Sequence, residues 1–209
     1  MNILIDDLPE SVTIAEKEFP VNWGFRTFIL IEICIFDAAL SDRDRIINAL
    51  LLFYGDNIPT DIGQAYEKMM WFYRGGKDLK SEKKGEGFSS PKRCYCFEQD
   101  ASYLYAAFRT QYRIDLQDIS SNDLHWWKFK ALFESLDDDL KISKIMSYRV
   151  TDTKGMDKGQ KKFYSDMKKL YALETEMNAD SKMALAKRDA DMLKHVNRRM
   201  REVDSENKG

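Results

Sequence analysis

The sequence contains few of the residues that define several large classes of protein. Its 209 residues include only four prolines, ten glycines and three cysteines. Such low proline and glycine content excludes collagen-like chains and other Pro/Gly-rich repeats. An odd number of cysteines does not indicate a closed set of disulfides, so we expect reduced thiols.

Long apolar runs are also missing. The longest, residues 49–54, has six residues, whereas a membrane-spanning helix needs roughly 20. The first residues are acidic and lack the basic segment and apolar core of a secretory signal. With 44% hydrophobic and 33% charged residues, the composition is typical of a globular chain. We therefore expect a cytoplasmic protein without a membrane partner.

Charge is small in total and uneven along the chain. The net charge is −2, made up of −6 in residues 1–74, +3 in 75–93, −2 in 94–149 and +3 in 150–209. A nucleic-acid-binding domain usually shows a concentrated basic excess, but the basic segments here also carry many acids. We interpret them as solvated surface and expect no nucleic-acid partner. The asymmetry favours a charged protein partner or self-association.

Motifs that carry catalytic or metal chemistry are absent from the sequence. It has no His-Glu-x-x-His, no Gly-x-Ser-x-Gly and no phosphate-binding glycine loop. Cys94 and Cys96 form a Cys-x-Cys pair without a second pair, and His125 and His195 lie far from it. Four zinc ligands at a workable spacing are therefore not available. We expect no catalytic residues, no metal site and no cofactor.

The hydrophobic pattern predicts a mainly α-helical fold, a compact bundle of about six to seven helices. Alternating apolar residues predict a small β-hairpin at residues 8–20. Helical spacing and capping residues predict helices at about 23–40, 41–55, 59–74, 101–112, 120–136 and 137–149, and a charged helix from 157 into the tail.

The same pattern predicts two parts of the chain. Residues 1–150 should form the helical domain with the N-terminal hairpin. A segment rich in Gly, Ser and Lys, residues 75–93, should be a flexible linker within it. The remaining residues, 151–209, should form an amphipathic helix and a charged tail.

The first predicted helix is apolar on nearly every side. Asn22 is a plausible N-cap for it, and Glu32 is the one residue that interrupts its apolar middle. A helix that is apolar all round belongs in the centre of a bundle. Glu32 would then be buried or at a helix edge, where a carboxylate needs a partner.

The most distinctive segment is aromatic. At 100° per residue, Trp126 and Phe129 fall on one stripe of a helix and Trp127 on another. Such a helix is either sandwiched in the core or has one face free for a partner, in which case the three residues are candidate contacts. His125 fits a hydrogen-bonded histidine at the core edge better than a catalytic base, because no nucleophile motif lies near it in sequence.

The C-terminal segment carries a weak heptad-like seam. Met183, Leu193 and Met200 belong to it, with Ala186, Ala190 and Asn197 at the intervening positions. The seam is too short to predict a coiled coil by itself. Two interpretations stay open, a frayed tail and a helix that orders on docking to another subunit. In the second, Met183, Leu193 and Met200 are candidate partner contacts.

Several segments together resemble a known protein family. They are Leu8–Ile14, Glu18–Asn22, Phe25–Phe28, Ala101–Phe108, Tyr112–Leu116, Leu124–Phe129 and Lys144–Arg149. The chain resembles, over about residues 5–150, small proteins from the tail-assembly region of long-tailed phages and prophages of Gram-positive bacteria. These proteins are similar in gene position and size to the tail assembly chaperones, which are encoded between the major tail protein and the tape measure protein.

The resemblance implies a non-catalytic tail assembly chaperone in the host bacterial cytoplasm. It would bind the tape measure protein transiently during tail morphogenesis, and also the major tail protein, a companion chaperone or a second copy of itself. The alternative is a structural virion protein, such as a tail-completion or connector component. An enzyme of phage metabolism would need a pocket with convergent polar groups, which nothing in the sequence predicts.

Overall fold

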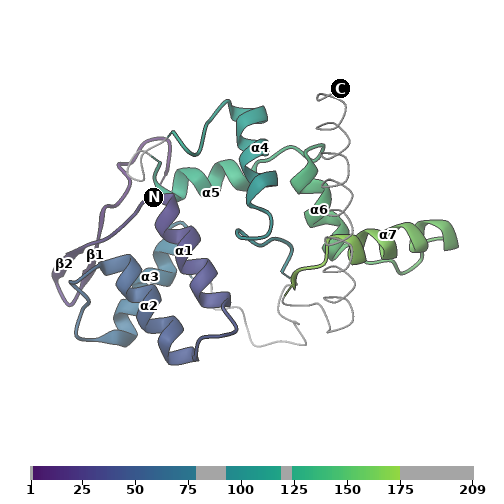
Figure 1. Ribbon diagram of the computed structural model, residues 1–209. Helices are drawn as coiled ribbons and strands as arrows, with labels where there is room; N and C mark the ends of the chain where they lie inside the picture. The colour runs from purple at the N-terminus through teal and green to yellow at the C-terminus, as the bar shows by residue number, and fades with distance from the viewer. Residues whose placement is uncertain (1, 79–92, 119–123, 175–209) are drawn as a thin grey trace, which may run out of the picture.

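The computed structural model describes residues 2–78, 93–118 and 124–174, and in these ranges the chain forms two strands and seven helices. They are β1 (Ser11–Ile14), β2 (Lys17–Pro20), α1 (Phe25–Phe36), α2 (Asp42–Tyr54), α3 (Ile62–Tyr73), α4 (Ala101–Tyr112), α5 (Trp126–Glu134), α6 (Lys141–Val150) and α7 (Lys158–Leu170). The predicted mainly α fold with an N-terminal hairpin is confirmed (Figure 1). None of the described helices is both long and apolar enough to cross a membrane.

The N-terminal hairpin is antiparallel and joined by a two-residue turn. Its register pairs Val12 with Phe19 and Ile14 with Lys17. Ala15 and Glu16 form the turn with φ of 47° and 62°. Two positive φ angles suit the right-handed twist of the strands, although neither residue is the glycine or asparagine usual there. Val12 and Ile14 are buried and fix the hairpin to the helical body.

Side-chain caps set the starts of three helices. Ser41 accepts a hydrogen bond from the Asp44 N–H at the start of α2, and Asp61 accepts one from the Gln64 N–H at the start of α3. Asp157 forms a capping box with Gln160 at the start of α7. These caps confirm the predicted starts of the three helices.

Three predicted helix starts are wrong. α6 begins at Lys141 and not at about residue 137. The first helix begins at Phe25, because the backbone N–H of Asn22 donates to the Phe53 carbonyl and its side-chain amide donates to the Leu52 carbonyl, each at 2.8 Å. Asn22 thus satisfies carbonyls at the end of α2, which lack partners within that helix. The aromatic helix, predicted to start at about residue 120, is α5, which begins at Trp126 with His125 as its N-cap; residues 119–123 lie outside the described residues.

Aromatic side chains make up the centre of the core. Phe28 stacks on Phe72 and on Trp126, with ring centroids 5.4 and 5.0 Å apart. Phe129 stacks in the same way on Phe108 at 5.0 Å. These contacts join α1, α3, α4 and α5 in one apolar core.

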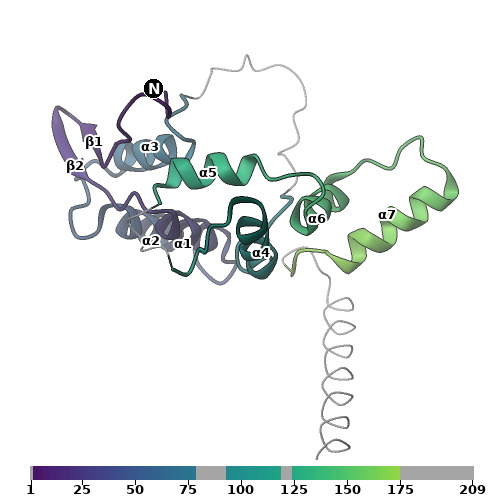
Figure 2. The same cartoon turned by 90° about the horizontal axis from the view of Figure 1, so that it is seen from above.

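The C-terminal helices lie to one side of that core. α6 packs on α4, and α7 packs on α6 through Tyr148, whose ring lies 5.8 Å from that of Phe163. Figure 2 shows α7 extending away from the other helices, and it has no buried residue. The chain then returns, and Leu173 is 2% exposed. α6 ends at Val150, and the predicted division of the chain at this residue stays a prediction.

A buried ion pair fastens this returning segment. Arg149 donates to both carboxylate oxygens of Asp100, at 2.6 and 2.9 Å, and both side chains are at most 4% exposed. Arg149 also donates to the carbonyls of Cys94 and Tyr171. One guanidinium therefore joins α6, the segment before α4 and the segment after α7.

The predicted linker is described only at its edges, since residues 79–92 lie outside the described ranges. Gly75 and Gly76, at its start, close the end of α3 with backbone hydrogen bonds to Phe72 and Trp71. A Cβ on Gly76 would lie 2.6 Å from the Trp127 ring. This part of the segment is packed against the core.

Candidate partner-binding surface

The three aromatic residues predicted as partner contacts lie in the core. Trp126, Trp127 and Phe129 are 3%, 5% and 1% exposed. The indole N–H of Trp126 donates to the Tyr73 carbonyl, and that of Trp127 to the Phe72 carbonyl. In the folded chain these three side chains offer almost no surface to a partner. Of the two arrangements considered for this helix, α5 therefore adopts the one in which it is sandwiched in the core.

His125 has a structural role at the start of α5. Its Nδ1 accepts a hydrogen bond from the Trp127 backbone N–H at 3.0 Å, so the proton lies on Nε2, which donates to the Pro9 carbonyl at 3.0 Å. The ring stacks on Trp23. Burial lowers the pKa of His125, because it disfavours the imidazolium. Both ring nitrogens are engaged, as expected for a core-edge histidine.

The other three predicted contacts, Met183, Leu193 and Met200, lie outside the described residues.

The described residues leave one side of α1 open. Its inner side buries Phe25, Phe28 and Ile31 against α2 and α5, but Leu30 is 51% exposed. The prediction that this helix is buried on every face is therefore wrong. The sequence of α1 is apolar on nearly every side, but the helices packed against it cover only part of its surface.

A groove follows the open side of α1, between α1 and α2. We call it the α1–α2 groove. It has a volume of about 530 Å³ and is lined by Leu30, Ile33, Cys34, Asp37, Leu40, Asn48, Leu51 and Leu52. Leu51, on α2, is 45% exposed, and Ile47, one turn earlier, is 38% exposed. The surface of the groove is mostly apolar, with one carboxylate.

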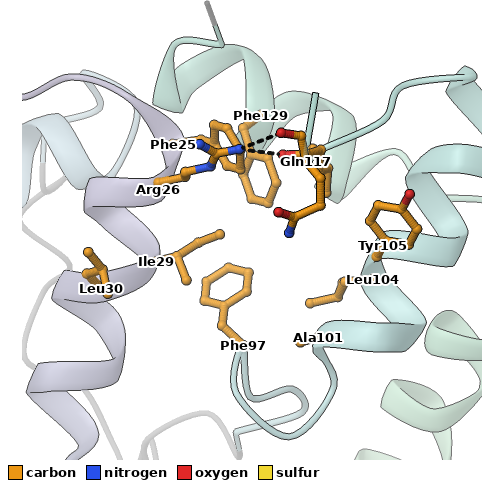
Figure 3. A pocket seen from close by; sticks show the side chains of 11 residues that line it. Phe25, Arg26, Ile29, Leu30, Phe97, Ala101, Leu104, Tyr105, Gln117 and Phe129 are labelled. Atoms are coloured by element: carbon orange, nitrogen blue, oxygen red, sulfur yellow. Dashed lines mark hydrogen bonds between the residues drawn. The ribbon is translucent and has the colours of Figure 1, made fainter. Parts of the chain in front are cut away.

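A second cavity adjoins the groove at Leu30. This α1–α4 pocket has a volume of about 340 Å³, and its walls come from α1, α4, α5 and the chain on either side of α4. Figure 3 shows Ile29, Phe97 and Leu104 pointing toward one another across it. Arg26 borders it and donates to the Leu116 carbonyl at 2.8 Å. Together the two cavities form a continuous apolar surface along α1.

On its inner side, α1 carries the buried carboxylate of Glu32. It accepts hydrogen bonds from the hydroxyls of Tyr73 at 2.6 Å and Tyr95 at 3.2 Å, and Arg93 lies 3.8 Å away. The predicted need for partners is thus confirmed. Burial raises the pKa of Glu32, partly offset by these hydrogen bonds. The cluster anchors α1 to α3 and to residues 93–95.

The described ranges offer little support for a metal site or a reactive cysteine. No group of three or more His, Cys, Asp and Glu side chains there is placed to hold a metal ion. Cys34 lines the α1–α2 groove, and burial raises its pKa, which disfavours a reactive thiolate. What the apolar surface along α1 can do is bind another apolar surface.

Sequence reasoning missed this surface, although a signal was present. The segment from Phe28 to Phe36 has one polar residue in nine. A surface helix normally needs only an apolar stripe. The excess of apolar residues on α1 could have indicated a second face available to a partner.

Comparison with known proteins identifies a phage family. A family model described as "Bacteriophage Gp15 protein" matches residues 4–173. Neither a curated protein nor a solved structure matches the chain.

Proposed function

The chain belongs to the bacteriophage Gp15 protein family, and from this premise we propose that it is a non-catalytic tail assembly chaperone. In this role it binds the tape measure protein transiently in the host bacterial cytoplasm. Tail tube subunits of the major tail protein then displace it as the tube forms. Family membership alone is equally compatible with a structural protein of the virion.

The observation that carries the proposal is the apolar surface along α1. Soluble monomers rarely expose large contiguous apolar patches unless a partner covers them. Leu30 and Leu51, at 51% and 45% exposure, are the most exposed apolar side chains of the α1–α2 groove. An apolar stripe of a helical partner is the complementary shape, as in other helix-in-groove interactions.

The size of the surface suits transient binding. The two cavities that make up the surface share Leu30 and have volumes of about 530 and 340 Å³. Interfaces of small area are typical of weak and reversible complexes. A chaperone that has to leave when the tube polymerises needs such an interface.

The first test is co-expression with the tape measure protein of the same phage, followed by co-purification. The double variant Leu30→Lys/Leu51→Lys places two charges in the groove and should abolish co-purification. Ile62→Lys is the matched control, because Ile62 is 48% exposed on α3 and lines neither cavity. Unchanged circular dichroism spectra would show that both variants are folded.

Mass spectrometry of purified virions separates the chaperone from a structural protein. Absence from mature particles, together with groove-dependent binding, supports the chaperone. Stoichiometric presence in particles would make the protein a structural component of the tail, and the chaperone proposal would be withdrawn.

A further inference from the structure

We propose that the α1–α2 groove is also the docking site of the chain's own C-terminal segment, residues 182–201. The segment then covers the apolar surface until a partner displaces it. The competition with a partner rests on the proposed function, but the docking does not. Three features support this: where the described chain ends, how far the segment reaches, and its chemistry.

The described chain ends beside the apolar surface. Gln99 fixes this end, because its side chain donates to the Ala172 carbonyl at 2.9 Å and accepts from the Glu174 N–H at 3.1 Å. Two residues before Gln99, Phe97 lines the α1–α4 pocket, which shares Leu30 with the α1–α2 groove. The C-terminal segment therefore starts close to one end of this surface.

The segment is long enough to reach the groove and lie along it. Eight residues separate Glu174 from Met183, and fully extended they span at most about 26–29 Å. As a helix, the seam from Met183 to Met200 is about 26 Å long, whereas the 12 residues of α1 span about 18 Å. The seam can thus cover both cavities along α1.

The chemistry of the segment matches the groove. Its seam has Met and Leu side chains, and Met adapts well to irregular apolar cavities. Residues 182–201 carry seven basic and two acidic side chains, a net +5, whereas residues 30–52, which supply the groove lining, carry four acidic and two basic ones, a net −2. Asp37 lines the groove, and Arg45 nearby on α2 is paired with Asp42 at 3.0 Å. The segment therefore complements the groove in both hydrophobicity and charge.

Site-specific photocrosslinking in the full chain tests the docking. The photoreactive residue p-benzoylphenylalanine replaces Leu51 in one sample and Ile62 in the control. Both positions are about half exposed, so neither replacement should unfold the protein. We expect position 51 to crosslink to peptides from residues 182–201 within one chain, at the monomer mass and independently of protein concentration.

A seam variant provides the second arm. Met183→Ser/Leu193→Ser/Met200→Ser should lower the crosslinking yield from position 51 by about tenfold or more, for which a loss of about 1.4 kcal/mol is sufficient. The docking is refuted if position 51 gives no crosslink to residues 182–201, or if position 62 gives an equal yield. It is also refuted if the crosslinks form only at the dimer mass, because a second copy would then occupy the groove.

The two proposals can fail separately. Crosslinking uses the chain alone, without a tape measure protein. Crosslinks without co-purification of the tape measure protein would refute the chaperone function and leave the docking intact. Groove-dependent co-purification without crosslinks would refute the docking and leave the chaperone function intact. If both hold, the seam variant should retain more tape measure protein than the unaltered chain does.

Discussion

The buried pair of Arg149 and Asp100 gives the sharpest prediction of stability. Arg149→Ala removes a guanidinium that bonds both oxygens of Asp100 and the carbonyls of Cys94 and Tyr171. Within the described ranges, Asp100, 1% exposed, then keeps only the hydrogen bond from the Cys96 N–H. Leaving a buried charge unpaired typically costs about 3–5 kcal/mol, and we expect a loss of that size in the free energy of unfolding.

Urea denaturation followed by circular dichroism measures this loss. The matched control is Asp139→Asn, which breaks the pair with Lys144, a contact between side chains that are 101% and 47% exposed. This control should leave the unfolding midpoint unchanged. The double variant Asp100→Leu/Arg149→Met should be less destabilised than Arg149→Ala, because no unpaired charge remains buried. A cost for Arg149→Ala below about 1 kcal/mol, as in exposed pairs, would refute the reasoning.

Two further predictions concern the packing around α5. Gly76→Ala should destabilise the protein more than Gly155→Ala, as measured by urea denaturation. Both glycines have positive φ, about 74° and 80°, which costs an L-residue roughly 1–2 kcal/mol. Only the Cβ at position 76 would also meet the Trp127 ring, at 2.6 Å. An equal cost for both would show that the ring yields freely. Because burial lowers the pKa of His125, the stability it provides is present above its unfolded-state pKa of about 6.5 and is lost as the pH falls through the folded-state pKa. His125→Asn, which retains an N-cap acceptor, should therefore make unfolding free energy less dependent on pH between 7 and 5, and an unchanged slope would contradict the assignment.

Much of the fold could be predicted because local signals specify it. The caps at Ser41, Asp61 and Asp157 set the starts of α2, α3 and α7 from nearby residues alone. The alternation around Val12 and Ile14 was sufficient for the hairpin. Such features depend on residues within one turn of a helix or strand, which is the range in which sequence patterns are informative.

Other features could not be predicted because they depend on distant contacts. Asn22 looks like an N-cap in sequence, but the end of α2 brings the Leu52 and Phe53 carbonyls within reach of it. The pairing of Arg149 with Asp100 joins residues 49 positions apart. Neither partner can be identified from spacing along the chain.

The predicted partner contacts show most clearly that a sequence pattern does not identify what a side chain packs against. Trp126 and Trp127 are the most conspicuous residues in the sequence, and large aromatic side chains are common at the centres of interfaces. The fold instead uses them to fill the space beside α3, where their indole N–H groups bond to the Phe72 and Tyr73 carbonyls. A sequence pattern shows that a side chain needs burial, but not whether the same chain or a partner provides it.

The aromatic core and the apolar surface have related origins. Phe28 and Phe129, both fully buried, stack with partners from several helices and hold the inner side of α1 in place. The buried Glu32 binds two tyrosine hydroxyls, which fixes the rotation of α1 about its own axis. With that rotation fixed, Leu30 cannot turn inward and remains at the junction of the two cavities. A preformed apolar surface loses little conformational entropy on binding, so even a small one can hold an apolar helix reversibly.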